Sequence, residues 1–320
     1  MDPGPDPGAA VPDPDRVGEA ALSSRATQVL RAAFLLAVVV FAWLSLRGRF
    51  DEVGHALADT SPAGAAGALV LVLLGLTATG VLWLRLMAAL GAELPFTDGS
   101  AMFFVGQLGK YIPGSVWSIG AQADRARRHD VPPRVTVAAG LLFLGYNVDT
   151  AALVGSLALI SGRLDPDWPT WVPWVGLVVS LVGLAPPLVR LLARKIGGRE
   201  PSLDLAGTGA VVVLLALAWA CYSVALVLLA PGTPWHDLVA LGGAFTIGYA
   251  VGVVIVFAPA GVGARETVFV LLLTPMLSVA DATALALVAR VVHTAADALM
   301  AAGWSYAARS RILSEPRSTP

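Results

Sequence analysis

The sequence predicts an all-α polytopic membrane protein with six to eight transmembrane helices. Hydrophobic residues make up 57% of its 320 residues, and charged residues only 13%. Soluble domains carry about 25% charged residues, so this chain has too few charges to cover a surface that faces water. Several of its apolar stretches also approach or exceed the roughly 20 residues that a helix needs to cross a bilayer. Both observations exclude a soluble globular protein.

The apolar stretches divide the chain into one membrane domain, expected over 29–308, and two polar ends. Residues 1–28 are rich in Pro, Gly, Asp and Ala, which predicts a disordered tail, and 309–320 form a second polar tail. The segment 51–60 is too polar to cross and is expected at the interface. The stretches expected to cross the membrane are 29–46, 63–90, 134–161, 171–192, 206–230 and 282–306.

Two further regions, 99–128 and 237–277, each contain short apolar arms around a Pro/Gly motif. The first motif is Pro113-Gly114, and the second is APAGVG at 258–263. Such motifs break helices, and a broken helix at membrane depth is tolerated only where protein or a water-filled cavity satisfies the freed backbone groups. We therefore expect one or two re-entrant broken helices.

The two motifs resemble each other, since YIPGSVWSIGAQADR and FAPAGVGARETVF share an aromatic residue, a proline, small residues and a polar pair. If 99–128 is re-entrant, three crossings separate it from the second motif, which then enters from the opposite side. This is the pattern of an inverted repeat, as in many transporters. In the alternative interpretation, 237–257 crosses fully, giving eight crossings and one hairpin. The sequence leaves both open.

The distribution of basic residues predicts that both termini are cytoplasmic. Arginines gather in the tails and in the segments on one side, whereas the other side holds only Arg47, Arg49 and Arg163. Lys110 and Lys195 are the only lysines in a chain rich in Arg, Ala, Gly and Val, a composition that indicates a bacterial source. We therefore expect a multi-pass protein of the bacterial plasma membrane. The net charge of −1 argues against nucleic-acid binding.

Ionisable side chains inside a membrane cost at least about 2.5–3.5 kcal/mol at mid-depth, so they are candidates for function. We expect them to line a central polar cavity in which cations bind an anionic headgroup. Arg290, His293 and Asp297 share one face of the last span, being spaced by three and four. Structural ion pairs and interhelical hydrogen bonds are the alternative explanation. The candidate substrate-binding residues are Lys110, Tyr111, Gly114, Gln122, Asn147, Asp149, Arg265, Glu266, Arg290, His293 and Asp297.

The chain contains no GxSxG or HExxH motif, and GQLGKY is not a P-loop. Cys221 is the only cysteine, which excludes an intramolecular disulfide and a cysteine-based metal site. We therefore expect a non-enzymatic protein without a metal or a cofactor. Asp165 and Asp167 could hold a metal in a transferase, although an acidic turn explains them as well.

GQLGKYIPGSVWSIGAQADRARR (106–128), FAPAGVGARETVF (257–269) and the arginine in the last span together resemble the lysylphosphatidylglycerol synthase transmembrane-region family. The resemblance covers roughly 30–306. It implies a lipid-handling domain, because the family includes the flippase half of the bacterial multiple peptide resistance factor. Relatives without the synthase half are linked to glycolipid or polyprenol-linked sugar pathways. Only a short polar segment follows the last span, so we expect this chain not to make lysylphosphatidylglycerol.

These observations favour a translocase for a lipid or a lipid-linked intermediate. Its partner would be an anionic phospholipid or a polyprenyl-phosphate-linked lipid. Two alternatives stay open: a membrane-embedded transferase that acts on a lipid-linked sugar, and an accessory subunit that positions a partner membrane enzyme in a cell-envelope glycolipid pathway.

Overall fold

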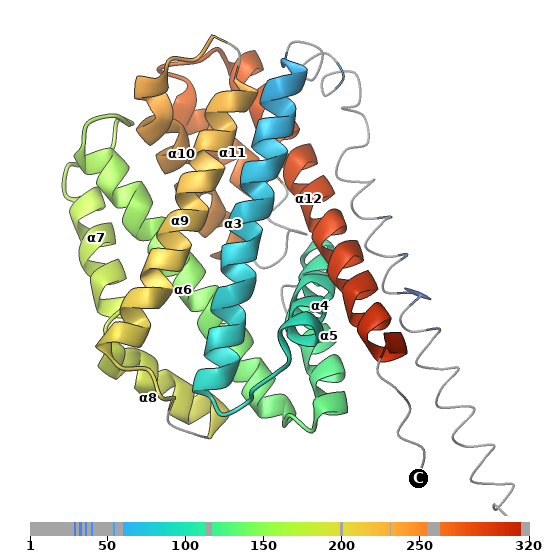
Figure 1. The fold of residues 1–320 in the computed structure, drawn as a ribbon. Helices are drawn as coiled ribbons and strands as arrows, with labels where there is room; N and C mark the ends of the chain where they lie inside the picture. The colour runs from blue at the N-terminus through green and yellow to red at the C-terminus, as the bar shows by residue number, and fades with distance from the viewer. Residues whose placement is uncertain are drawn as a thin grey trace, which may run out of the picture.

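The computed structural model describes residues 60–112, 117–198, 201–230, 232–254 and 263–314, with a few single positions before residue 60. Within these residues every regular element is a helix, which confirms the all-α class (Figure 1). The helices are α3 (Pro62–Ala89), α4 (Phe96–Gln107), η1 (Leu108–Tyr111), α5 (Trp117–Ala126), η2 (Arg127–His129), α6 (Pro133–Ile160), α7 (Val172–Gly183), α8 (Pro186–Gly197), α9 (Leu205–Leu229), η3 (Trp235–Asp237), α10 (Leu238–Val254), α11 (Ala264–Leu273) and α12 (Val279–Ser314).

Five of the described helices are long and apolar enough to cross a membrane: α3, α6, α9, η3 with α10, and α12. Four of them coincide with the expected spans at 63–90, 134–161, 206–230 and 282–306, so the polytopic fold is confirmed. The helix α12 continues to Ser314, into the segment expected as a polar tail. Apart from single positions, the expected tail 1–28 and first span 29–46 lie outside the described residues.

The helix starts follow from local sequence. Ser61 precedes α3, and its hydroxyl accepts a hydrogen bond from the Gly64 N–H at 3.0 Å. The Asp204 carboxylate does the same for α9, accepting from the Gly207 N–H at 2.7 Å. Both side chains satisfy backbone donors that a helix leaves free at its N-terminus.

The stretch 171–192, expected to be one crossing, is two helices bent by 59° between α7 and α8. The cause is Pro186-Pro187, because proline lacks the N–H of a continuous helix and disfavours the helical conformation of the preceding residue. Ala185 accordingly has an extended backbone (ψ 126°). As a bent pair, α7 and α8 make a sixth candidate span.

The helices α3 and α9 pack side by side and run antiparallel (Figure 1). At one end, the Ser202 N–H donates to the Ala89 carbonyl at 2.9 Å. At the other end, the Thr60 hydroxyl donates to the Leu229 carbonyl at 3.4 Å. These contacts define the two ends of the bundle. Each remaining helix can be described by the end at which it begins.

Two helical hairpins enter the bundle from these opposite ends. The pair α4–α5 begins where α3 ends, and the pair α10–α11 begins where α9 ends (Figure 1). By length alone α10 could cross the membrane, but α11 turns back along it, and a Cβ on Gly248 of α10 would lie 2.8 Å from the Arg265 carbonyl oxygen. Within the described residues, the two hairpins thus point into the bundle from opposite ends, as the inverted interpretation expects. The turns themselves, including Pro113, Gly114 and 255–262, lie outside the described residues.

Candidate functional site

A cavity of about 240 Å³ lies where the two hairpins meet inside the bundle. Its wall includes η1 and the start of α5 from the first hairpin, and the end of α10 and the start of α11 from the second. Side chains of α3, α6, α9 and α12 complete it. The cavity is therefore lined by described residues from both arms of each hairpin.

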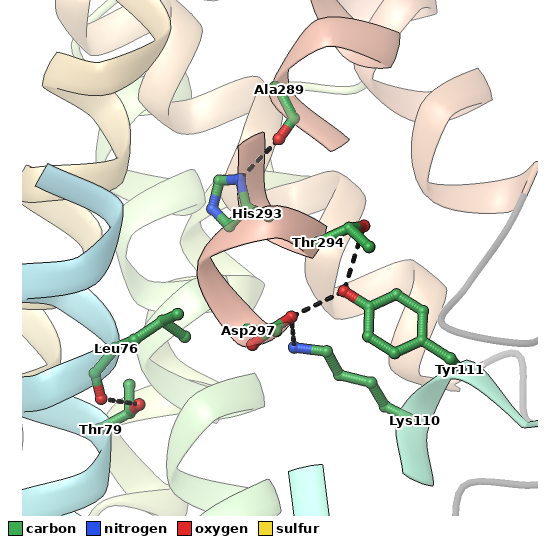
Figure 2. A network of polar contacts seen from close by, with 8 residues as sticks. All are labelled: Leu76, Thr79, Lys110, Tyr111, Ala289, His293, Thr294 and Asp297. Atoms are coloured by element: carbon green, nitrogen blue, oxygen red, sulfur yellow. Dashed lines mark hydrogen bonds and ion pairs between the residues drawn. The ribbon is translucent and has the colours of Figure 1, made fainter. Parts of the chain in front are cut away.

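One cluster of polar side chains links the first hairpin to α12 (Figure 2). The Lys110 ammonium lies 2.6 Å from Oδ2 of Asp297, and the Tyr111 hydroxyl donates to the same oxygen at 2.7 Å. The hydroxyls of Tyr111 and Thr294 lie 3.2 Å apart and share a hydrogen bond. Only 3% of the Asp297 side chain is exposed, so its charge depends on these partners.

A second cluster links the other hairpin to the same helix. Glu266 of α11 pairs through Oε1 with the Arg290 guanidinium of α12, and both side chains are largely buried. Its other oxygen, Oε2, accepts a hydrogen bond from the Gly263 N–H at 2.8 Å. Glu266 therefore caps the N-terminus of α11 and attaches it to α12.

Arg265 is the third cation of the cavity, and it makes no ion pair with any described residue. Its guanidinium carbon lies 4.3 Å from the centre of the Phe245 ring and 5.8 Å from that of Tyr249. Aromatic faces attract a cation without neutralising it. Arg265 therefore keeps a full positive charge that is available to a ligand.

His293, whose side chain lines the cavity, has one nitrogen without a hydrogen-bond partner among the described residues. Its Nδ1 lies 2.8 Å from the Ala289 carbonyl oxygen, so this nitrogen carries a proton and donates it (Figure 2). In the neutral ring, Nε2 is then an acceptor. This atom is buried and has no hydrogen-bond partner among the described residues.

Three more buried polar atoms in the cavity wall have no partner within the described part of the chain: Oγ of Ser118, Oε1 of Gln122 and Nε of Arg290. Buried polar groups are nearly always hydrogen-bonded, because leaving one unpaired costs roughly 1–3 kcal/mol. The side chains of the cavity wall therefore have hydrogen-bonding capacity that no described residue uses.

The structure brings most of the candidate residues together. Asp149 is not among the residues that line the cavity. It faces α7, where a Cβ on Gly183 would lie 2.7 Å from the Asp149 carboxyl carbon. Gly114 lies outside the described residues. The candidates that line the cavity are Lys110, Tyr111, Gln122, Asn147, Arg265, Glu266, Arg290, His293 and Asp297.

Sequence reasoning missed an aromatic wall of the cavity, made by Trp219, Tyr222, Phe245 and Tyr249. The Trp219 ring lies 5.1 Å from that of Tyr249, and its N–H donates to the Thr150 hydroxyl at 3.0 Å. Aromatic residues in an apolar span look like lipid-facing ones, so only the mid-span polar neighbours of Trp219 in WACYS could have pointed to it. Ser118 and Thr294 were missed as well.

Across the described ranges, no three His, Cys, Asp or Glu side chains gather closely enough to hold a metal ion. The polar groups of the cavity are instead suited to hydrogen bonding and to binding charge. Arg265, Arg290 and Lys110 supply cations, and Gln122 and His293 supply acceptors.

Comparison with curated proteins found no match. A model of the lysylphosphatidylglycerol synthase TM region matches residues 29–301, which include both hairpins and the cavity-lining part of α12. The match covers most of the chain. This protein is therefore an integral membrane protein that belongs to the lysylphosphatidylglycerol synthase TM region family.

Proposed function

We propose that this protein is a translocase that carries an anionic lipid or lipid-linked intermediate across the plasma membrane of a bacterial cell. The observation that supports this most is the charge of the cavity. Among the described residues its wall holds three basic side chains, Lys110, Arg265 and Arg290, against the two carboxylates of Glu266 and Asp297. The excess of basic side chains between the two hairpins and α12 suits a phosphate.

The arrangement of the hairpins also favours transport. Transporters built from inverted repeats place their substrate between broken helices near the middle of the bilayer. Here the first hairpin offers a cation, Lys110, to α12, and the second offers an anion, Glu266. We expect these attachments to break and reform during alternating access from the two sides.

The size of the cavity sets what it can hold. At about 240 Å³ it is smaller than the 300–1,000 Å³ typical of pockets for drug-sized ligands. A space of this size suits a lipid headgroup better than two acyl chains. The chains must therefore stay in the surrounding bilayer while the headgroup passes.

Replacing Arg265 with glutamine tests the proposal. In proteoliposomes we expect the protein to accelerate the flipping of phosphatidylglycerol labelled on an acyl chain, measured by quenching the label from outside. Arg265→Gln removes the unpaired cation and should slow flipping at least about tenfold, because a hydrogen bond to a charged group is worth about 1.5–3 kcal/mol.

The matched control is Arg85→Gln, since Arg85 is exposed on α3 and does not line the cavity. This variant should flip lipid as the wild type does. Equal rates for Arg265→Gln and the wild type, or equal losses in both variants, would contradict a role for the cavity.

The orientation of the protein is tested separately. Basic residues of η2, of the end of α8 and of the end of α12 gather at one end of the bundle. There the Arg311 guanidinium donates a hydrogen bond to the Thr97 hydroxyl at the start of α4. We propose that this end faces the cytoplasm. In a Cys221→Ala background, an impermeant maleimide added to intact cells should label Asp167→Cys and leave Ser310→Cys unlabelled. The reverse labelling would refute this orientation.

A further inference from the structure

We propose that Asp149 is a proton-binding site inside the membrane and that its bound proton holds the bent pair α7–α8 against α6. The site lies apart from the cavity, since Asp149 faces α7 and does not line the cavity wall. Proton binding at Asp149 does not require translocation of a lipid, so either can fail without the other.

Asp149 lies near the middle of the membrane, at the level of the bend between α7 and α8. It is eleven residues from the end of α6, and Gly183, the last residue of α7, is eleven residues from the start of α7. The segment 161–171 joins these two helix ends, so both residues lie roughly 16 Å from the same end of the bundle. That is about half of the roughly 30 Å hydrocarbon core, where a carboxylate is least tolerated.

The packing of α6 on α7 brings the carboxyl group to the bend. Gly176, Ser180 and Gly183 share one face of α7, being spaced by four and three. A Cβ on Gly176 would overlap Oγ of Ser156 on α6, and a Cβ on Gly183 would lie 2.7 Å from the Asp149 carboxyl carbon. Small residues let two helices approach closely in a membrane. Asp149 lies at the end of this close contact, against the last turn of α7.

Within the described residues, no basic side chain compensates a charge on Asp149. Its carboxyl takes part in no ion pair or hydrogen bond there. The helix that it faces, α7, contains no ionisable residue. In α8 the Arg190 guanidinium donates to the Leu203 carbonyl at 2.7 Å, and Arg194 and Lys195 are exposed. An ionised Asp149 would therefore be a charge at mid-depth without a counter-ion among these groups.

The other helices packed on α6 do not supply a counter-ion either. These helices are α3, α5, α9 and α10. No ion pair joins Asp149 to any of their ionisable residues, which are Arg85, Asp124, Arg125, Cys221, Tyr222 and Tyr249. On α6 itself, Tyr146 lies three residues before Asp149, and a phenol carries no positive charge.

The end of α7 offers acceptors to a proton on Asp149. In the described residues no backbone N–H donates to the carbonyls of Gly183 and Leu184. Pro187 has no N–H, and the Leu188 N–H donates to the Ala185 carbonyl at 3.0 Å. A carboxylate would meet these oxygens and the negative end of the helix dipole, whereas a protonated carboxyl has an O–H to donate. The same proline bend that frees the carbonyls thus makes a place for the proton.

Dicyclohexylcarbodiimide, a hydrophobic reagent, tests for the proton on the unaltered full-length protein in detergent. The O–H of a protonated carboxyl adds across one C=N bond of the reagent, and the adduct rearranges to a stable N-acylurea where water is scarce. The reagent can reach Asp149, because the side chain is half-buried and a Cβ on Gly145, one turn earlier, would meet no atom within 4 Å.

At pH 7, where an aspartate in water is ionised, mass spectrometry of the digested protein should find the label on Asp149. The exposed Asp165 and Asp167, in the loop between the same two helices, are the internal control and should carry at least about tenfold less label. Asp149→Asn should remove the label from its segment. Absence of the label from Asp149 at pH 7 would overturn the proton site.

Hydrogen exchange tests whether the proton holds α7–α8. The amide of Asp149→Asn can donate as the protonated carboxyl does, so at pH 7 the backbone of 180–189 should exchange as in the wild type. Asp149→Ala has no donor, and the same segment should exchange about three- to tenfold faster, as the loss of one ordinary hydrogen bond implies.

The matched control for the exchange experiment is Leu157→Ala, which shortens an exposed side chain on the same helix and should leave the exchange of 180–189 unchanged. Equal exchange in Asp149→Ala and the wild type would overturn the role of the proton in holding α7–α8. Exchange in Asp149→Asn as fast as in Asp149→Ala would also overturn it, because a carboxylate and not a donor would then be required.

Discussion

Glu266→Gln should lower the free energy of unfolding by about 3–5 kcal/mol and abolish lipid flipping. The change leaves the Arg290 guanidinium, only 12% exposed, without its carboxylate. A buried cation without a partner is far costlier than no ion pair at all. The same change weakens the hydrogen bond from the Gly263 N–H at the start of α11. Thermal unfolding in detergent, followed by tryptophan fluorescence, should show a midpoint lower by roughly 10 °C.

Two further variants separate stability from function. The double variant Glu266→Met with Arg290→Met removes both charges, so it should recover most of the lost stability while remaining inactive in flipping. Asp237→Asn disrupts the contact with the exposed His236 ring and should change the midpoint little. A single Glu266→Gln variant that melts like the wild type would show that the ion pair is not needed to hold the second hairpin.

Gly109→Ala should move η1 away from α5. We expect the free energy of unfolding to fall by about 1–3 kcal/mol and transport activity to be lost. A Cβ on Gly109 would lie 2.7 Å from the Ser118 nitrogen and 2.8 Å from the Trp117 carbonyl carbon. These are backbone atoms, so no side-chain rotation can relieve the overlap, and the turn of η1 must move away from α5. That movement would carry Lys110 away from Asp297. Thermal unfolding and the flipping assay measure both effects.

The control variants are Gly145→Ala and Gly303→Ala, which lie within α6 and α12 and have no atom within 4 Å of the added Cβ. Alanine in a helix is favoured over glycine by roughly 0.5–1 kcal/mol, so these variants should be neutral or slightly stabilised. If Gly109→Ala behaves as they do, the close approach of η1 to α5 is not required for the fold.

The long spans could be predicted from the sequence, because the length needed to cross a bilayer is a strict requirement that composition reveals directly. The bend between α7 and α8 was not predicted, although Pro186-Pro187 was visible, because the hydropathy of the stretch 171–192 suggested one continuous span. The hairpins were predicted from their Pro/Gly motifs. Which of the two interpretations applied to the second hairpin depended on packing between α10 and α11, which no local pattern encodes.

For the candidate site, the cost of burying charge was a good guide to the ionisable residues. It placed Lys110, Arg265 and Asp297 in one expected cavity, where the structure has them. The same rule also selected Asp149, which faces α7, because the cost of a charge does not say toward which neighbour it points. The aromatic side chains carry no charge, so the cost of burying charge did not point to the aromatic wall. Phe245 and Tyr249 could equally well have faced lipid.

The helix α12 carries the attachments of both hairpins. Asp297 binds the first through Lys110, and Arg290 binds the second through Glu266. The two positions are about two turns apart, or roughly 10 Å along the axis. Because a single stiff rod bears both attachments, a displacement of that rod strains the two together. We therefore expect a shift of α12 to move both hairpins together, which would couple a change at one face of the bilayer to the other.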